Sequence, residues 1–476
     1  MPRTTPGSLI SNGINGANGK YFRPAMTAAE ISAVACAEPP AEDIHLRELR
    51  WWAELTRQRH LGPREGIDPK NLAEAGWGVI FSHDAKKKVL RALAPLLAHR
   101  RAQASRRSER FYREFTGADG YRAGESKLQF LARHGVGHGP ADPRKMPYYL
   151  LLVGGPSEIP FRFQYQLDVQ YAVGRLDLDG PQAYRRYARS VVRSETRRKK
   201  RSRRAVFFGV KNRGDRATEI SHDHLVRPLA KRFAKKAQGW KIRKVLGQRA
   251  TKKRLLTLIG GKKTPDLLFT ASHGVGFPAG HKRQEPHQGA LLCQDWPGPA
   301  KGSGKVSQEV YLAGDDVADD ARLAGLVSLH FACFGAGTPR LDEFAHRSAD
   351  VQAVMAPHDF VARLPQRLLG HPRGGALAVI GHVERCWSHS FLGRRAGRQL
   401  QVYQSLLQRL FAGHPVGSAM EYFDQRYAEL SSDLAEELEE LRFGRTLREA
   451  ELAGLWTARN DARSFIVLGD PAVRLK

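Results

Sequence analysis

The chain has 476 residues, of which 41% are hydrophobic and 26% charged. This composition excludes a largely disordered chain and allows two or three packed domains. The formal charge of +29 has two interpretations, a binding surface for nucleic acid or another polyanion, or an arginine-rich surface without a partner. Because the basic residues are scattered over most of the chain and match no nucleic-acid-binding motif, we favour the second.

Four cysteines stand far apart without a CxxC pair: Cys36, Cys293, Cys333 and Cys386. This spacing suggests neither a disulfide framework nor a structural zinc site, and it favours reduced thiols in a cytosol. The first residues lack the apolar core of a signal peptide, and no apolar run approaches the roughly 18 residues of a membrane span. We therefore expect a cytoplasmic protein without a metal or cofactor.

The first 140 residues are predicted to be a mainly helical region that begins with a loose arm. Residues 1–45 are rich in Gly, Asn, Pro and Ala, which is typical of loop structure. Apolar residues recur at helical spacing in "HLRELRWWAEL" (45–55) and "KKVLRALAPLLAHRRAQ" (87–103). The sequence of this region matches no module that indicates its function.

From residue 141 onward the pattern changes to short, continuous apolar runs that end in glycine or polar residues. The runs are 148–155, 205–210, 266–274, 326–333 and 375–383. Continuous apolar strands are typical of a parallel sheet covered on both faces, and helical stretches between them give a βαβ order. We predict an α/β fold with a mostly parallel sheet flanked by helices, in which ligands bind beyond the carboxyl ends of the strands.

Two of these runs end on side chains that are suited to covalent catalysis. "LLFTASHGVGF" (267–277) reaches His273 and then Gly274, and "LVSLHFACFGAG" (326–337) reaches Cys333. A cysteine attacks a carbonyl as a thiolate, and a neighbouring imidazole favours that form and protonates the leaving amine. The backbone N–H groups of Gly274 and Cys333 are candidates for the oxyanion hole. The alternative is a buried inert thiol beside a structural histidine.

The His-Gly and Ala-Cys blocks, sixty residues apart between His273 and Cys333, resemble the motif of the caspase-like (clan CD) cysteine peptidases. The stretch at 148–176 is similar to the first α/β subdomain of gingipain-type peptidases, and "VLGDPAVRL" (467–475) is similar to the closing strand of gingipain-like and CHAT peptidases. This resemblance implies a caspase-hemoglobinase-like sheet. It also implies a first subdomain at 141–196 and a catalytic domain at 205–476. The run of basic residues at 197–204 between them has no apolar anchor and predicts a linker.

The resemblance further implies that Cys333 is the nucleophile and His273 the general acid and base of an endopeptidase. In caspase-like enzymes the loop after the first strand of the catalytic domain often contacts the P1 side chain, the residue before the cut bond. Here that loop contains Asp215 between Arg213 and Arg216. Either arginine would select an acidic P1 residue, but we favour Asp215, which predicts a basic one; a plain charged turn is an equal alternative. With a basic P1, "RRKKRSRR" (197–204) would be a self-cleavage site, but a flexible linker is the preferred interpretation.

The sequence therefore predicts an intracellular cysteine endopeptidase whose partner is a protein or peptide substrate. The N-terminal region is a candidate docking site for an activating partner, and the family resemblance suggests a role in bacterial defence or cell death. Residues 277–320 are predicted to form a rim or lid over the cleft. The alternative function is a basic, nucleic-acid-associated binding protein on a degenerate peptidase scaffold.

Overall fold

The computed structural model describes residues 9, 11–23, 25–37, 62–137, 139–197, 203–261, 264–299, 304–344, 354–393, 397–443 and 448–476. The expected helix at 45–55 and most of the basic linker at 197–204 lie outside these residues. Within the described residues, no helix is both long and apolar enough to cross a membrane.

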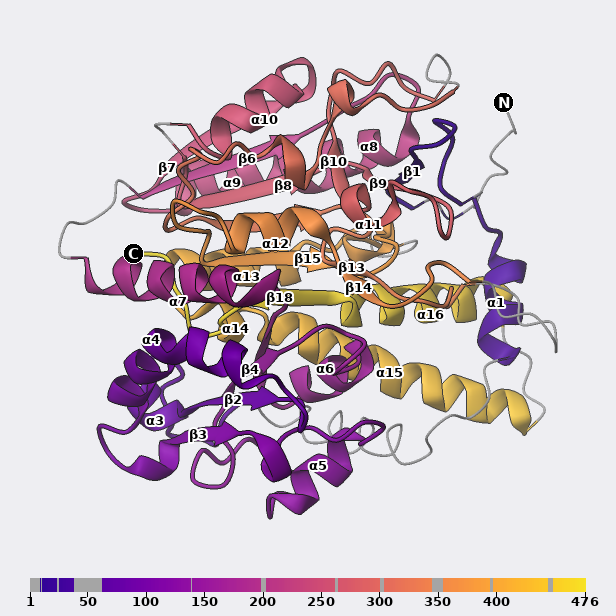
Figure 1. Ribbon diagram of the computed structural model, residues 1–476. Coiled ribbons are helices and arrows are strands. Elements are labelled where there is room, and N and C mark those ends of the chain that lie inside the picture. Colours follow the sequence, from indigo (N-terminus) through magenta and orange to yellow (C-terminus); the bar gives the residue numbers. More distant parts are fainter. Residues whose placement is uncertain are drawn as a thin grey trace.

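Ten strands form one central sheet, in the order β3-β2-β4-β5-β18-β15-β12-β8-β6-β7. Figure 1 shows this sheet running from β3 at the bottom of the molecule to β7 at the top. The strands of the sheet are β2 (Trp77–Phe81), β3 (Tyr112–Phe115), β4 (Tyr149–Val153), β5 (Ala172–Leu176), β6 (Arg204–Gly209), β7 (Lys241–Leu246), β8 (Leu267–Ala271), β12 (Val327–Phe331), β15 (Ala378–His382) and β18 (Phe465–Gly469).

The α-helices fill most of the connections between these strands. They are α1 (Ala28–Ala37), α3 (Leu72–Ala75), α4 (Lys87–Ala104), α5 (Lys127–Arg133), α6 (Phe161–Asp168), α7 (Gly180–Thr196), α8 (Arg216–Ile220), α9 (Arg227–Lys236), α10 (Lys252–Leu258), α11 (Gln284–His287), α12 (Arg363–Leu369), α13 (Gln401–Phe411), α14 (Val416–Ala419), α15 (Glu421–Arg442) and α16 (Glu449–Arg463). With this mixed α/β architecture on a mostly parallel sheet, the predicted fold class is confirmed.

The apolar runs of the sequence are the central strands of this sheet. Every residue of β4, β8, β12 and β15 is buried, as expected for parallel strands that are covered on both faces. Their apolar side chains belong to one large hydrophobic core. The strand ends that hold the candidate residues are therefore rigidly placed.

The sheet has two parallel parts that meet at one antiparallel pair. β18 runs parallel to β5 but antiparallel to β15, and the remaining neighbours in the sheet are parallel. The strand near the end of the chain thus joins the part built from β2 to β5 to the part that contains β8 and β12.

The N-terminal region differs in part from the mainly helical expectation for residues 1–140. The helix expected at 87–103 is α4, but strands β2 and β3 also come from this region. β2 is a short apolar run directly after α3, and β3 is a partly exposed edge strand with polar residues. Neither has enough residues for a periodic pattern to reveal it.

A smaller sheet lies against the candidate site. Its strands are β1 (Gly13–Asn15), β9 (Gly274–Gly276), β10 (Ala290–Leu292) and β11 (Tyr311–Leu312), in that order. β9, β10 and β11 come from the segment at and after His273, and β1 comes from the segment expected to be a loose arm. Figure 1 shows β1, in indigo, next to β9 at the edge of the molecule.

Candidate active site

His273 and Cys333 follow two neighbouring strands at matching positions. β8 and β12 are parallel partners, and their last residues, Ala271 and Phe331, lie opposite each other. The two candidate residues each come two positions later in the sequence. The backbones stay in close contact beyond the strands, since a Cβ atom on Gly274 would lie only 1.7 Å from the carbonyl oxygen of Cys333. Only glycine fits after the histidine.

The two backbone N–H groups predicted to form an oxyanion hole converge on one oxygen atom. The carbonyl oxygen of Asn12 accepts hydrogen bonds from the N–H of Gly274 at 2.9 Å and from the N–H of Cys333 at 3.2 Å. Two donors on one carbonyl oxygen are the arrangement that stabilises the oxyanion of acyl transfer. The oxygen belongs to a peptide group of the N-terminal segment of the same chain.

Asp215 is the hydrogen-bond partner of the histidine. Its Oδ2 lies 2.7 Å from Nε2 of His273, and both side chains are fully buried. Burial alone would raise the pKa of Asp215, but the neighbouring imidazole and the hydrogen bonds from Thr218 and Tyr21 hold this pKa below its ordinary value. The carboxylate is therefore ionised and orients the imidazole, a use that differs from the predicted contact with a P1 side chain.

The remaining contacts of Asp215 leave little of it free. It is the N-cap of α8 and accepts from the Thr218 backbone N–H and hydroxyl. The Tyr21 hydroxyl donates to its other oxygen at 2.5 Å. Sequence reasoning missed the pairing with His273 because the two residues are 58 positions apart and no local pattern links them.

The imidazole of His273 is held between two aromatic rings. Tyr21 lies edge-on at 5.8 Å between ring centroids, and Trp296 lies perpendicular to it at 6.0 Å. Its Nδ1 is buried and makes no hydrogen bond within the described part of the chain. One ring nitrogen is thus fixed by Asp215, and the other remains available for proton transfer.

The sulfur of Cys333 is fully buried. The backbone N–H of Cys386 donates to it at 3.2 Å, and burial raises the pKa of the Cys333 thiol to about 12. Part of this cover comes from the N-terminal segment, because a Cβ atom on Gly13 would lie 3.2 Å from this sulfur. A thiol in this state is protonated and shielded near neutral pH.

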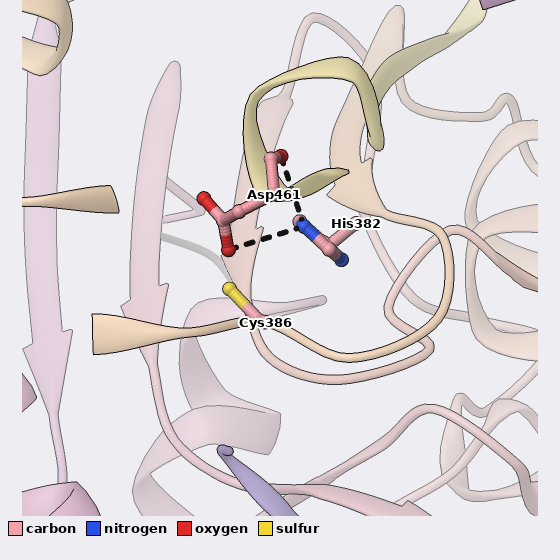
Figure 2. Close-up of side chains that lie close together, drawn as sticks. All are labelled: His382, Cys386 and Asp461. Atoms are coloured by element: carbon pink, nitrogen blue, oxygen red, sulfur yellow. Dashed lines mark hydrogen bonds and ion pairs between the residues drawn. The ribbon is translucent and has the colours of Figure 1, made fainter. Parts of the chain in front are cut away.

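The loop after β15 forms another wall of the site and is anchored from behind. Figure 2 shows His382, Cys386 and Asp461 converging, with the imidazole facing the Asp461 carboxylate and backbone carbonyl. The carboxylate also accepts from the Trp387 backbone N–H at 2.8 Å and from the Ser390 hydroxyl.

His382, Cys386 and Asp461 offer ligand atoms within 4.8 Å of one another, and zinc uses such residue types. The Asp461 oxygens, however, already accept protein hydrogen bonds. Burial also raises the pKa of Cys386 well above its ordinary value, so the thiolate ligand is disfavoured. We interpret the cluster as the support that fixes the loop around Cys386.

No protein-family model matches the chain, and no curated protein matches it. Its fold is similar to that of three solved structures. A crystal structure of the Arg-specific cysteine proteinase gingipain R aligns with 87% of this chain and 80% of its own, at 14% identity and a TM-score of 0.47. A structure described only as a protease aligns with 88% of this chain and 80% of its own, at 12% identity and a TM-score of 0.46. A chain from the complex of the pro- and mature domains of RgpB from Porphyromonas gingivalis aligns with 84% of this chain and 80% of its own, at 13% identity and a TM-score of 0.45.

Proposed function

We propose that the protein is a cysteine endopeptidase. Cys333 is the nucleophile, and His273 takes its proton and passes it to the leaving amine. The N–H groups of Gly274 and Cys333 stabilise the oxyanion of the tetrahedral intermediate. Asp215 is a positioning residue, because its contact is with the histidine.

One observation supports this proposal above the others. A peptide carbonyl already occupies the place between the N–H groups of Gly274 and Cys333. An inert thiol next to a structural histidine would not require two backbone N–H groups that bind one carbonyl oxygen beside it. The geometry thus favours acyl transfer over the alternative of a buried, non-catalytic cysteine.

The basic P1 preference was predicted from Asp215, and the contacts of this residue do not favour it. The carboxylate accepts from His273, Thr218 and Tyr21. A P1 arginine would have to replace Tyr21 to reach it. The role in bacterial defence remains a hypothesis from the family resemblance alone.

Peptide-library hydrolysis by the full chain tests the proposal. We expect wild type to cut peptides, and we expect Cys333→Ala to lower kcat/KM by several orders of magnitude, because a nucleophile acts as part of one catalytic unit. Cys36→Ala is the control, since Cys36 is an exposed thiol on α1. Because the N-terminal segment covers the sulfur, we also assay Gly13→Val, whose larger side chain would crowd Cys333 and is expected to displace the segment.

The same variants distinguish the peptidase proposal from the alternative of a nucleic-acid-binding protein. A pocket of about 480 Å³ beside α9 is lined mainly by basic side chains, together with Asp223 and Pro228; the basic ones are Arg227, Lys231, Arg232, Lys235 and Arg398. If the protein acts through this charge, salt-sensitive binding to nucleic acid would persist in Cys333→Ala, and neither wild type nor Gly13→Val would cut any peptide. That result would refute the peptidase proposal.

A further inference from the structure

The N-terminal segment crosses the candidate site as an extended peptide. Its backbone meets the protein on both sides of Asn12. Ser11 forms an antiparallel bridge with Trp387, and residues 13–15 pair in parallel with residues 274–276. Addition of an extended segment to exposed strand edges is a common mode of peptide recognition.

Asn12 makes the set of backbone contacts that a P1 residue needs. Its carbonyl oxygen accepts from Gly274 and Cys333, and its N–H donates to the carbonyl oxygen of Cys386 at 3.0 Å. The peptide bond that follows leads to Gly13, which lies against the Cys333 sulfur. The register therefore places the Asn12–Gly13 bond at the nucleophile.

The side chains on both sides of this bond suit the space around them. Asn12 is 1% exposed, and its amide donates to the carbonyl oxygen of Ser272 at 3.4 Å. Gly13 has no side chain, and a Cβ atom at this position would lie 3.2 Å from the sulfur and 3.3 Å from Cβ of Cys333. The site thus holds a small polar amide before the bond and glycine after it.

The following residues anchor the segment. Ile14 is fully buried in the core of the small sheet, and the Phe22 N–H donates to the carbonyl oxygen of Gly13 at 2.9 Å. The Tyr21 hydroxyl reaches Asp215 behind the histidine. The segment therefore contacts the nucleophile, the oxyanion donors and the positioning residue at once.

We propose that residues 11–13 occupy the substrate site of their own chain, and that the enzyme cuts itself between Asn12 and Gly13. This inference rests on the proposed peptidase function and names its substrate class, an asparaginyl bond followed by a small residue. Residues 197–204, the earlier candidate for self-cleavage, lie mostly outside the described residues.

The reaction is balanced within the chain and one water molecule. As the Cys333 sulfur bonds to the Asn12 carbonyl carbon, its proton passes to His273. The carbon–nitrogen bond to Gly13 then breaks, and His273 gives that proton to the Gly13 nitrogen. Water hydrolyses the thioester, which yields an Asn12 carboxylate and restores the thiol.

The sequence contains its own control. Three Asn-Gly pairs follow each other at residues 12–13, 15–16 and 18–19, and only the first has its carbonyl oxygen bonded to Gly274 and Cys333. Spontaneous deamidation and cleavage at Asn-Gly do not require Cys333. They would favour the pair at Asn18, which is exposed.

The experiment follows the intact mass of the denatured full-length protein during incubation. Denaturation is needed because the bridge between Leu9 and Met26 holds the released piece in place. We expect wild type to lose residues 1–12 at a first-order rate independent of protein concentration, with Gly13 as the new N-terminus. Asn18→Gln is expected to behave like wild type, whereas Cys333→Ala, Gly13→Val and Asn12→Lys are expected to stay intact.

Reporter peptides complete the test. We expect asparagine at P1 to be preferred over arginine by about tenfold or more in kcat/KM, because a site built from hydrogen bonds to the substrate discriminates against side chains that cannot form them. Gly13→Val and Asn12→Lys are both expected to keep this activity towards reporter peptides. A wild-type chain that cuts reporters but stays intact at Asn12–Gly13 would overturn the inference and leave the peptidase function standing. Equal cleavage at all three Asn-Gly pairs, also in Cys333→Ala, would overturn it too. If wild type, Gly13→Val and Asn12→Lys all fail to cut any peptide, both the peptidase proposal and the self-cleavage proposal fail.

Discussion

At the scale of single residues, the site depends on one carboxylate that orients the imidazole. Asp215 is buried in contact with His273, and the lowered pKa keeps it ionised. Asp215→Asn keeps the shape but removes the charge that favours the imidazolium formed during proton transfer. We expect kcat to fall by about 10²-fold or more with KM unchanged, measured with reporter peptides on the full chain.

Thr218→Val is the matched comparison for Asp215→Asn. It removes a different hydrogen bond to the same carboxylate and leaves the charge beside His273 in place. We expect its kcat to stay much closer to that of wild type. Equal losses in both variants would indicate that Asp215 acts only as the N-cap of α8.

At the scale of elements, the loop after β15 is fixed by α16. Asp461 of that helix accepts from Trp387 and Ser390, and the loop supplies both backbone groups of Cys386 that face Asn12 and Cys333. Asp461→Ala leaves the Trp387 backbone N–H buried without this partner, which costs about 1–3 kcal/mol, whereas the Ser390 hydroxyl keeps its bond to the carbonyl oxygen of Trp387.

Two measurements check the role of Asp461. We expect urea unfolding of Asp461→Ala to show the stability loss, and reporter assays to show a raised KM because the displaced loop binds peptide backbone less well. Glu449→Ala is the control, because Glu449 is exposed on the first turn of the same helix. Normal stability in Asp461→Ala would contradict the anchoring role.

Strand ends were the elements that the sequence predicted best. Continuous apolar runs ending in His273 and Cys333 predicted both the parallel sheet and the neighbouring position of these residues. The docked segment at residues 11–16 was not predicted, because Gly and Asn indicate backbone freedom but not where an extended chain will pair. The partnership of Asp215 with His273 was missed for a related reason, since it depends on tertiary structure alone.

At the scale of the whole molecule, a buried ion network ties together distant parts of the chain. Arg100 of α4 is 1% exposed and contacts both Glu195 of α7 and Asp470, which follows β18. Breaking a buried network by removing one member leaves uncompensated charge and costs about 3–5 kcal/mol. We expect Arg100→Met to lose this much in free energy of unfolding, measured by denaturant titration near pH 7.

The same network gives stability a pH dependence. Burial alone would raise the pKa of Glu195, but Arg100 and His99 lower it far below the ordinary value of 4.5. Below about pH 4.5 the unfolded chain takes up a proton that the folded chain does not, so stability present above this pH is lost as the pH falls. We expect this acid-induced loss to be smaller in Arg100→Met, and an unchanged pH slope would contradict the assignment.

The antiparallel pair between β18 and β15 also bears on the order of events during synthesis. β18 follows the other strands of the described residues in chain order, yet it occupies the middle of the sheet. Until β18 has been made, the two parallel parts of the sheet are not joined to each other. Each contact that β18 makes with β5 or β15 closes a long loop of the chain. If the protein is the proposed peptidase, we expect its activity to appear only after β18 (Phe465–Gly469) has been synthesised and has paired with β15 and β5.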